Sequence, residues 1–293
     1  MPLVPFTDLL NDARRGGYAV GYFEAWDSYS LEAVLEAAEL EHSPVILGFG
    51  CLLLDQAWLE NGGIEIFGSL GRVVAGRSRV PVSLLLNEAH SLEHAVRGID
   101  AGFNAVMLAT SDAETIAALT RLAHARGTAV EAELDSLPDG NPEGEIDRSH
   151  ASLTDPDLAA AFVRATQVDA LAVSIGNVHT LEGEVAEVDL DRLAEIQRTV
   201  GVPLVIHGGT SFPAGAVPAA IARGVAKFNV GTTLKRILLE ELSAELRGVP
   251  EAASPHDLVG SHKSSDLLEG AKPRLVEKLR SLMRLYGSSG RAI

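Results

Sequence analysis

The stretch that decides the fold is PLVIHGGTS, residues Pro203–Ser211, in which an apolar run leads directly into histidine, two glycines and two hydroxyl residues. A short apolar run bounded by turn residues is typical of a buried strand. A second run, ALAVSIGNVHT (Ala170–Thr180), ends in His179 in the same way. We therefore expect two parallel strands that present His207 and His179 at one edge of a sheet, where a metal or substrate can bind.

Short apolar runs of this kind alternate with amphipathic helical stretches along the whole chain. Eight of them are predicted to be strands: Tyr18–Phe23, Pro44–Phe49, Pro81–Leu86, Ala105–Leu108, Ala129–Leu134, Ala170–Ile175, Pro203–Ile206 and Ala226–Val230. Strands that alternate with helices favour repeated βα units and a parallel sheet. Eight such units predict an α/β fold, a closed (β/α)8 TIM barrel, with residues 1–293 forming a single domain.

Two segments are too long for ordinary connections. Residues 135–150 follow the fifth strand and are polar and acidic, which predicts a lid over the functional end of the barrel. Residues 248–270 form an atypical loop before a C-terminal helix that begins at Lys272. We expect that loop to be a surface excursion or an oligomer contact.

Composition narrows the classes of partner. The formal charge of −16 disfavours nucleic acid and anionic membrane surfaces, so we expect neither as a partner. One cysteine, Cys51, cannot build a disulfide framework, and no apolar run has the length of a membrane span. With no signal-like N-terminus, a cytoplasmic protein is the expectation.

Two glycine-bearing turns follow the last two predicted strands, HGGTS and FNVGTTL. Backbone amides in such strand-to-helix turns can surround a phosphate, although glycines also serve close packing. The residues predicted to bind phosphate or substrate are Gly208, Gly209, Thr210, Ser211, Asn229, Gly231 and Thr232. A metal and a phosphate would then lie side by side.

Several blocks of sequence resemble the class II, metal-dependent fructose- and tagatose-bisphosphate aldolases. They are GGYAVGYF, SLEHAVRGIDAGFNAVML, HARGTAVEAEL, VDALAVSIGNVHT, DLDRLAEI, VPLVIHGGTSFP, KFNVGTTL and LYGSSGRA. The resemblance implies a lyase that cleaves or forms a carbon–carbon bond in a small phosphorylated ketose through a dihydroxyacetone-phosphate enediolate. It also implies zinc held by His179 and His207, and a homodimer or homotetramer.

Two departures from the family pattern lie at the third strand. The family reads Leu-Asp-His-Gly where this chain reads Leu86-Asn87-Glu88-Ala89. Two histidines and one glutamate form an established catalytic zinc set, so Glu88 is the predicted third ligand, ahead of His90. A carboxylate ligand also admits Mn²⁺, Fe²⁺ or Co²⁺. The family's His-Gly is His179-Thr180 here, so the binding of a monovalent cation beside His179 is left as an open alternative.

The second departure removes the family's general acid/base. A carboxamide cannot accept the proton, so Asn87 can only orient the substrate. The proton is expected to pass to Glu24 or Asp27 after the first strand, or to Glu143 or Glu145 in the acidic segment. For the first two, a solvated acidic turn is the competing interpretation.

Two further residues carry weaker hypotheses. Lys227, predicted to face the barrel interior, raises a Schiff-base mechanism as an alternative to metal chemistry. Glu133 matches a family glutamate close to the metal, or is a buried, hydrogen-bonded carboxylate.

Two other functions compete with the aldolase. A non-catalytic subunit that binds sugar phosphate or stabilises an aldolase would explain the loss of aspartate and histidine at the third strand. A metal-dependent sugar-phosphate isomerase or epimerase would use the enediolate without breaking the bond.

Overall fold

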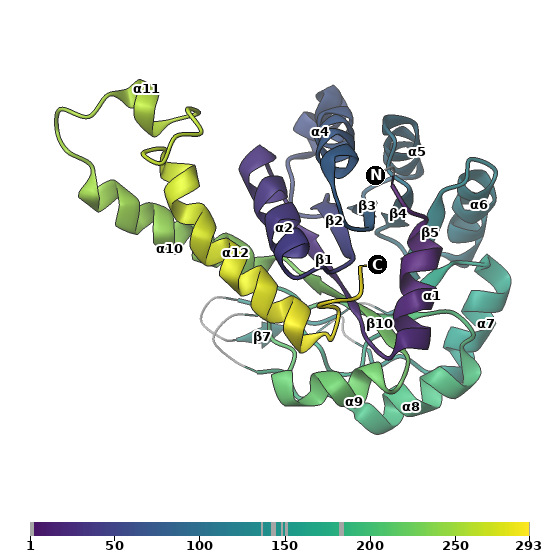
Figure 1. Ribbon diagram of the computed structural model, residues 1–293. Coiled ribbons are helices and arrows are strands. Elements are labelled where there is room, and N and C mark those ends of the chain that lie inside the picture. Colours follow the sequence, from purple (N-terminus) through teal and green to yellow (C-terminus); the bar gives the residue numbers. More distant parts are fainter. Residues whose placement is uncertain are drawn as a thin grey trace.

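The computed structural model describes residues 3–135, 137–141, 145–147, 149, 152–181 and 185–292. Eight parallel strands close a barrel in the order β1-β10-β9-β8-β5-β4-β3-β2 (Figure 1). They are β1 (Val20–Glu24), β2 (Val45–Gly50), β3 (Val82–Ala89), β4 (Ala105–Leu108), β5 (Ala129–Glu133), β8 (Ala170–Ala172), β9 (Leu204–Ile206) and β10 (Val225–Val230). The predicted TIM barrel and all eight predicted strands are confirmed.

Helices surround the barrel and follow its strands in turn. They are α1 (Phe6–Gly16), α2 (Ser28–Leu40), α3 (Gln56–Trp58), α4 (Ile64–Arg77), α5 (Leu92–Ala101), α6 (Ala113–His124), α7 (Pro156–Thr166), α8 (Leu190–Thr199), α9 (Val217–Ile221), α10 (Thr232–Gly248), α11 (Pro255–Leu258) and α12 (Leu267–Leu285), with a π-helical turn at Leu59–Gly63 and a 3-10 turn at Ala214–Ala216. Among the described residues, none of these helices is long and apolar enough to span a membrane.

The strand boundaries differ from the predictions mainly at two places. The predicted strand Ala170–Ile175 ends at Ala172, so His179 lies on the following loop and not at a strand end. Strand β3 runs to Ala89, three residues beyond the predicted Leu86, and its register with β4 becomes irregular between Leu86 and Ala89. Both differences bear on the site, because they place polar residues at the carboxyl end of the barrel.

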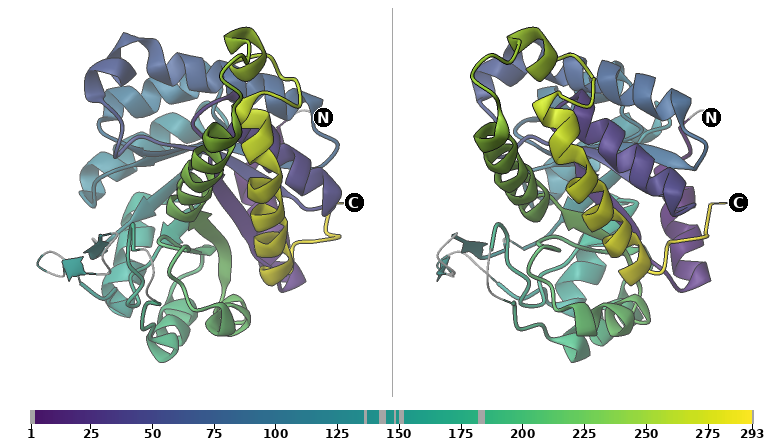
Figure 2. Two further views of the ribbon diagram at one scale, coloured as in Figure 1. Left: turned by 90° about the vertical axis from the view of Figure 1, so that its left-hand side faces the viewer. Right: turned by 60° about the vertical axis from the view of Figure 1, so that its left-hand side comes forward.

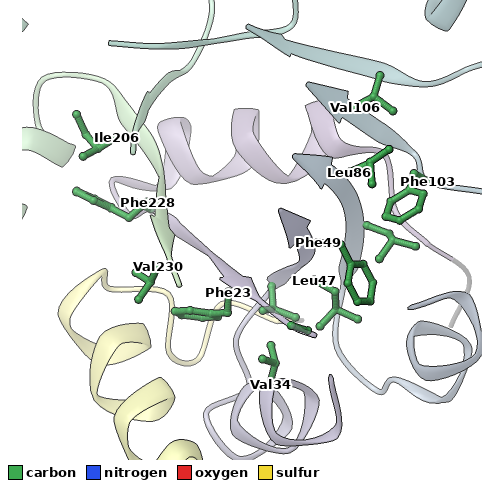
Figure 3. Close-up of a cluster of buried hydrophobic side chains, with 14 of the residues drawn as sticks. Phe23, Val34, Leu47, Phe49, Leu86, Phe103, Val106, Ile206, Phe228 and Val230 are labelled. Atoms are coloured by element: carbon green, nitrogen blue, oxygen red, sulfur yellow. The ribbon is translucent and has the colours of Figure 1, made fainter. Parts of the chain in front are cut away.

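Alternation along the strands separates two apolar layers, since successive side chains point to opposite faces. The outer layer packs strand residues against the helices and includes Phe23, Phe49 and Phe228 (Figure 3). The inner layer fills the barrel and continues into α1 through Phe6 and Leu10, both fully buried. Helix α1 therefore closes the amino end of the barrel, and the carboxyl end is left for the site.

Helices α10 and α12 form a long hairpin that reaches away from the barrel, with α11 near its tip (Figures 1 and 2). The predicted loop 248–270 lies at that tip, but it is shorter than predicted because α12 begins at Leu267. Within it, His262 stacks on Tyr29, with ring centroids 4.4 Å apart. The tip is therefore tied back to α2 and does not reach the pocket.

The end of the chain is fixed at the amino end of the barrel by a buried carboxylate. Glu41 accepts hydrogen bonds from Arg280 (2.8 Å), Arg284 (2.6 Å) and Ser289 (2.8 Å). Burial raises the pKa of Glu41, but these hydrogen bonds outweigh it and lower the pKa to about 2. The network joins α2, α12 and the last residues of the chain.

Candidate metal centre and active site

A pocket of about 470 Å³ opens at the carboxyl ends of the barrel strands. This volume suits a small ligand, and this end of such barrels carries the active site. The residues that line it are Tyr22, Glu24, Gly50, Leu52, Leu53, Asn87, Glu88, Asp139, Gly140, Asn141, His179, Thr180, His207, Gly208, Thr210, Asn229, Val230, Gly231, Thr232, Lys235, Arg236 and Leu239.

The three predicted metal ligands meet in this pocket. Ligand atoms of Glu88, His179 and His207 all lie within 4.8 Å of one another. Glu88 Oε1 is 3.3 Å from His207 Nδ1 and 3.9 Å from His179 Nε2. Ligand atoms bound to zinc at about 2.0–2.1 Å in a tetrahedral site lie about 3.4 Å apart, so the Glu88–His207 spacing of 3.3 Å matches and the Glu88–His179 spacing of 3.9 Å is wider.

The Glu88 side chain reaches His179 and His207 because strand β3 is distorted at Glu88. Its φ is +55°, in the left-handed region that a glutamate rarely adopts. Consecutive residues of a regular strand point to opposite faces, yet Asn87 and Glu88 both line the pocket. The left-handed residue turns both side chains toward the site. His90 is held elsewhere, with Nε2 3.0 Å from the Cys51 carbonyl oxygen.

His179 is positioned by the acidic segment after β5. Its backbone N–H donates to the Pro138 carbonyl (2.9 Å), and its carbonyl accepts from the Gly140 N–H (2.7 Å). Asp139, between them, lies 3.9 Å from His179 Nδ1 and lines the pocket. Strands β6 (Asp139–Gly140) and β7 (Ile146–Asp147) form a small hairpin here. The described part of the segment predicted to be a lid therefore borders the site, at Asp139, Gly140 and Asn141.

His207 is oriented from behind by a buried ion pair. Its Nε2 lies 2.9 Å from Glu131 Oε1, and Glu131 in turn is 2.8–2.9 Å from Lys227 Nζ. Asn229 contacts both His207 and Lys227: its amide nitrogen is 3.0 Å from His207 Nε2, and its amide oxygen accepts a hydrogen bond from Lys227 Nζ. A carboxylate on the far nitrogen of a ligating histidine fixes the ring and its tautomer. Nδ1 is thereby directed at Glu88.

The pKa shifts of Glu88, His179 and His207 favour a cation bound between these three side chains. Burial lowers the pKa of His207, but hydrogen bonds to Glu131 and Glu88 outweigh it and raise the pKa to about 9. Burial raises the pKa of Glu88, whereas the hydrogen bond from His207 lowers it. Burial lowers the pKa of His179, which favours its neutral, ligating form. A divalent ion can take the place of the proton on His207 Nδ1, so the residues fit a metal.

Five of the seven predicted phosphate-binding residues line the pocket: Gly208, Thr210, Asn229, Gly231 and Thr232. Gly209 and Ser211 do not line it, and the N–H groups of both are already hydrogen-bonded within the protein. Gly209 donates to the Asn229 carbonyl (2.9 Å) and Ser211 to the Gly208 carbonyl (3.3 Å). These two residues hold the shape of the turn.

Helix α10 supplies positive charge to the same region. Its amino end opens at Thr232 with no side-chain cap from Gly231, and Lys235 and Arg236 near its start also line the pocket. A helix amino end combined with cationic side chains attracts anions. Lys235 Nζ is 2.5 Å from Glu24 Oε1, so one of these cations already has a carboxylate partner.

Thr180 keeps the backbone shape of the glycine that it replaces. Its φ is +54°, the left-handed conformation that glycine adopts at little cost and a β-branched residue does not. Its hydroxyl donates to the Gly140 carbonyl at 2.6 Å. At this position beside His179, the chain therefore combines a backbone conformation suited to glycine with a hydroxyl bonded to the neighbouring segment.

The residues predicted to carry the proton are placed differently from one another. Glu24 lines the pocket. Asp27 instead caps α2, accepting from the Ser30 N–H at 2.7 Å, and it does not line the pocket. Glu143 lies outside the described residues, and Glu145 is exposed with its N–H bonded to Asn141. Burial raises the pKa of Glu133 to about 7.

Four residues of the proposed site were not predicted from the sequence: Glu131, which orients His207, Tyr22, whose buried hydroxyl faces the pocket, and the cations Lys235 and Arg236 at the start of α10. The signal for Glu131 was present, since a carboxylate in the apolar run AVEAEL needs a buried partner and Lys227 in AKFNV supplies one. Lys227 is held in this pair, which occupies the amine that the Schiff-base hypothesis required.

Comparisons with known proteins identify the family of the chain. The family described as "Fructose-bisphosphate aldolase class-II" matches residues 4–291. A probable fructose-bisphosphate aldolase of Bacillus subtilis is 32% identical, with all of both chains covered. A sulfofructosephosphate aldolase of Alkalicoccus urumqiensis is 30% identical, covering 97% of this chain and 96% of its own. The YdjI aldolase of Escherichia coli K12 superposes with a TM-score of 0.78 at 28% identity, covering 99% of this chain and 100% of its own.

Proposed function

The chain belongs to the class-II fructose-bisphosphate aldolase family, a divalent-metal-dependent family that acts on phosphorylated sugars, and we propose that it uses Glu88, His179 and His207 to hold the metal for aldol cleavage or formation. The observation that carries the proposal is the convergence of these three ligand atoms within 4.8 Å beside the glycine-bearing turns. Zinc suits a set of two histidines and one carboxylate.

The residues of the chain divide the work by position. Gly208, Thr210, Gly231 and Thr232 in the two turns bind the phosphate of a small ketose, with Lys235 and Arg236 supplying charge. A bound divalent metal would supply Lewis-acid polarisation of the ketose carbonyl. Glu131 keeps His207 directed at the site. Asn87, buried in the pocket wall, orients the substrate.

Proton transfer is assigned to Glu24. Of the two carboxylates predicted after the first strand, Glu24 lines the pocket and Asp27 caps a helix. Glu24 takes the proton of the hydroxyl next to the breaking bond; the carbon bearing that hydroxyl becomes the carbonyl of the released aldehyde, and the electrons of the broken bond leave dihydroxyacetone phosphate as the enediolate. Lys235 Nζ lies 2.5 Å from Glu24 Oε1. A Glu24→Gln variant is expected to lose at least about 100-fold in kcat and to keep its metal.

The direct test combines turnover with metal analysis. Purified protein is loaded with Zn²⁺ and given fructose 1-phosphate, fructose 1,6-bisphosphate and tagatose 1,6-bisphosphate, with and without chelator. We expect triose phosphate to form from at least one substrate and to stop with chelator. Glu88→Ala should abolish stoichiometric metal binding, whereas His90→Ala, two residues away, should retain it.

The outcomes separate the competing functions. Stoichiometric metal with no product would favour a binding or stabilising subunit. A rearranged ketose phosphate without triose, detected by NMR, would favour an isomerase or epimerase. Metal retained in Glu88→Ala would contradict the ligand assignment, whatever the activity.

The chain is further proposed to act as a homodimer or homotetramer. The projecting α10–α12 hairpin exposes Leu239 and Leu246 at 58% each, and Val259 near its tip is 70% exposed. Apolar side chains on a projecting element are typical of subunit contacts. Sedimentation equilibrium tests this, and a monomer at micromolar concentration would contradict it.

A further inference from the structure

Two buried polar atoms in the pocket wall have no hydrogen-bond partner among the described residues: the Tyr22 hydroxyl and Asn87 Oδ1. The two side chains are 2% and 4% exposed, and both line the pocket. Buried polar groups in folded proteins almost always have a partner, because an unpaired one costs free energy. Two such atoms in one pocket wall indicate that a bound molecule supplies their missing hydrogen-bond partners.

The strands bring these side chains to the same part of the wall. Tyr22 is on β1 and Asn87 on β3, with β2 between them. A Cβ placed on Gly48 of β2 would lie 1.8 Å from a ring carbon of Tyr22, so the phenol ring lies over that glycine. The Tyr22 hydroxyl is therefore carried from β1 across β2, toward the strand that bears Asn87.

We propose that Tyr22 and Asn87 together bind one hydroxyl group of the substrate, Tyr22 donating a hydrogen bond to its oxygen and Asn87 Oδ1 accepting its proton in a second. This inference rests on the proposed function, since the substrate is taken to be a phosphorylated ketose. A hydroxyl is the group that fits, because it both accepts and donates. A phosphate or aldehyde oxygen can only accept and would leave Asn87 Oδ1 unpaired.

The surroundings of Tyr22 keep it a donor. Burial raises its pKa well above the ordinary value, and the nearby carboxylates of Glu24 and Glu88 raise it further. Lys227 Nζ lies 4.9 Å from the ring centroid and holds the ring in place. A permanently protonated phenol cannot remove a proton, so the group that Tyr22 and Asn87 bind stays a hydroxyl. The acid–base step remains with Glu24.

Tyr22→Phe tests the proposal, because it removes the hydroxyl and keeps the ring over Gly48. With Zn²⁺-loaded protein and whichever of the three ketose phosphates wild type cleaves, kcat/KM should fall about 10- to 100-fold. Metal content should not change. The melting temperature should stay the same or rise, because the hydroxyl has no partner to lose in the free protein. Tyr18→Phe, just before β1 at the opposite end of the barrel, is the control and should match wild type.

A double variant tests whether both residues bind the same group. If they do, Tyr22→Phe combined with Asn87→Ala should lose less activity than the product of the two single losses. Unchanged kcat/KM in Tyr22→Phe, or a lower melting temperature with unchanged kcat/KM, would overturn the inference while leaving the aldolase assignment intact. Absence of turnover in wild type would instead overturn the proposed function, and this inference with it.

Discussion

The two ends of the barrel differ in whether the buried polar groups compared below have hydrogen-bond partners within the protein. At the amino end, the Glu41 carboxylate accepts three side-chain hydrogen bonds, and the Ser43 and Ser288 hydroxyls bond to each other at 2.8 Å. At the carboxyl end, Tyr22 and Asn87 each carry a buried polar atom with no partner among the described residues. These amino-end groups find their partners within the folded chain, whereas the two atoms in the pocket wall await a ligand.

Backbone strain, unlike hydrogen bonding, does not separate the two ends, because His42 before β2 and Gln167 before β8 also have left-handed φ values, +46° and +56°. Glu88 and Thr180 both adopt left-handed φ values beside the predicted metal ligands. Such residues cost of order 1–3 kcal/mol each and persist where the surrounding structure requires them. The strain turns Glu88 toward the two histidines. At the carboxyl end this strain shapes the proposed metal site.

The largest expected effect comes from removing a proposed metal ligand at the carboxyl end of the barrel. His207→Ala removes a proposed ligand, and we expect loss of stoichiometric metal and a fall in kcat of at least about 1000-fold. Elemental analysis and a triose phosphate assay measure both. Cooperative unfolding should persist, because the Glu131–Lys227 pair remains. Full activity with bound metal in this variant would break the proposed division between the two ends.

The Glu131–Lys227 pair is the part of the carboxyl end that resembles the amino end, because it is buried and internally paired. Lys227→Met leaves the Glu131 carboxylate buried without its cation, so the free energy of unfolding should fall by about 3–5 kcal/mol. Denaturant unfolding of metal-free protein measures this. Adding Glu131→Gln should recover part of the loss. A change below about 1 kcal/mol in Lys227→Met would show that the pair does not support the fold.

A smaller effect is expected at the amino end, with a distinct pH signature. The pKa of Glu41 in the folded state is about 2, below its ordinary 4.5, so its contribution is complete above about pH 4.5 and is lost as pH falls toward 2. Glu41→Gln should therefore lower the free energy of unfolding by about 2–3 kcal/mol at pH 7, and the difference from wild type should shrink in acid.

The matched control for Glu41 is on the same helix. Glu39 pairs with Arg79, whose side chain is 82% exposed, so Glu39→Gln should cost less than about 1 kcal/mol at pH 7. Both variants should keep the kcat of wild type. Equal losses in the two variants, or a Glu41 difference that does not depend on pH, would contradict the role given to the buried network.

The sequence was most informative where one residue type has one physical explanation. Eight apolar runs predicted eight strands, and two histidines followed by small residues predicted the site that the structure brings together. The position of His179 was harder to predict from the sequence, because it is set by backbone hydrogen bonds to Pro138 and Gly140, which are distant in sequence. Asp27 was ambiguous for a different reason, since a carboxylate before a helix serves equally as a cap or as an acid.

The left-handed backbone at position 180 gives the smallest expected effect and a direct measure of strain in the site. Asparagine tolerates this conformation better than a β-branched residue, so Thr180→Asn should raise the free energy of unfolding of the metal-free protein by about 0.5 kcal/mol. Thr110→Asn is the control, because Thr110 has no positive φ, and it should give no gain. Calorimetric melting of both variants measures the difference. A loss in Thr180→Asn would mean that the hydrogen bond to Gly140 outweighs the backbone strain at this residue.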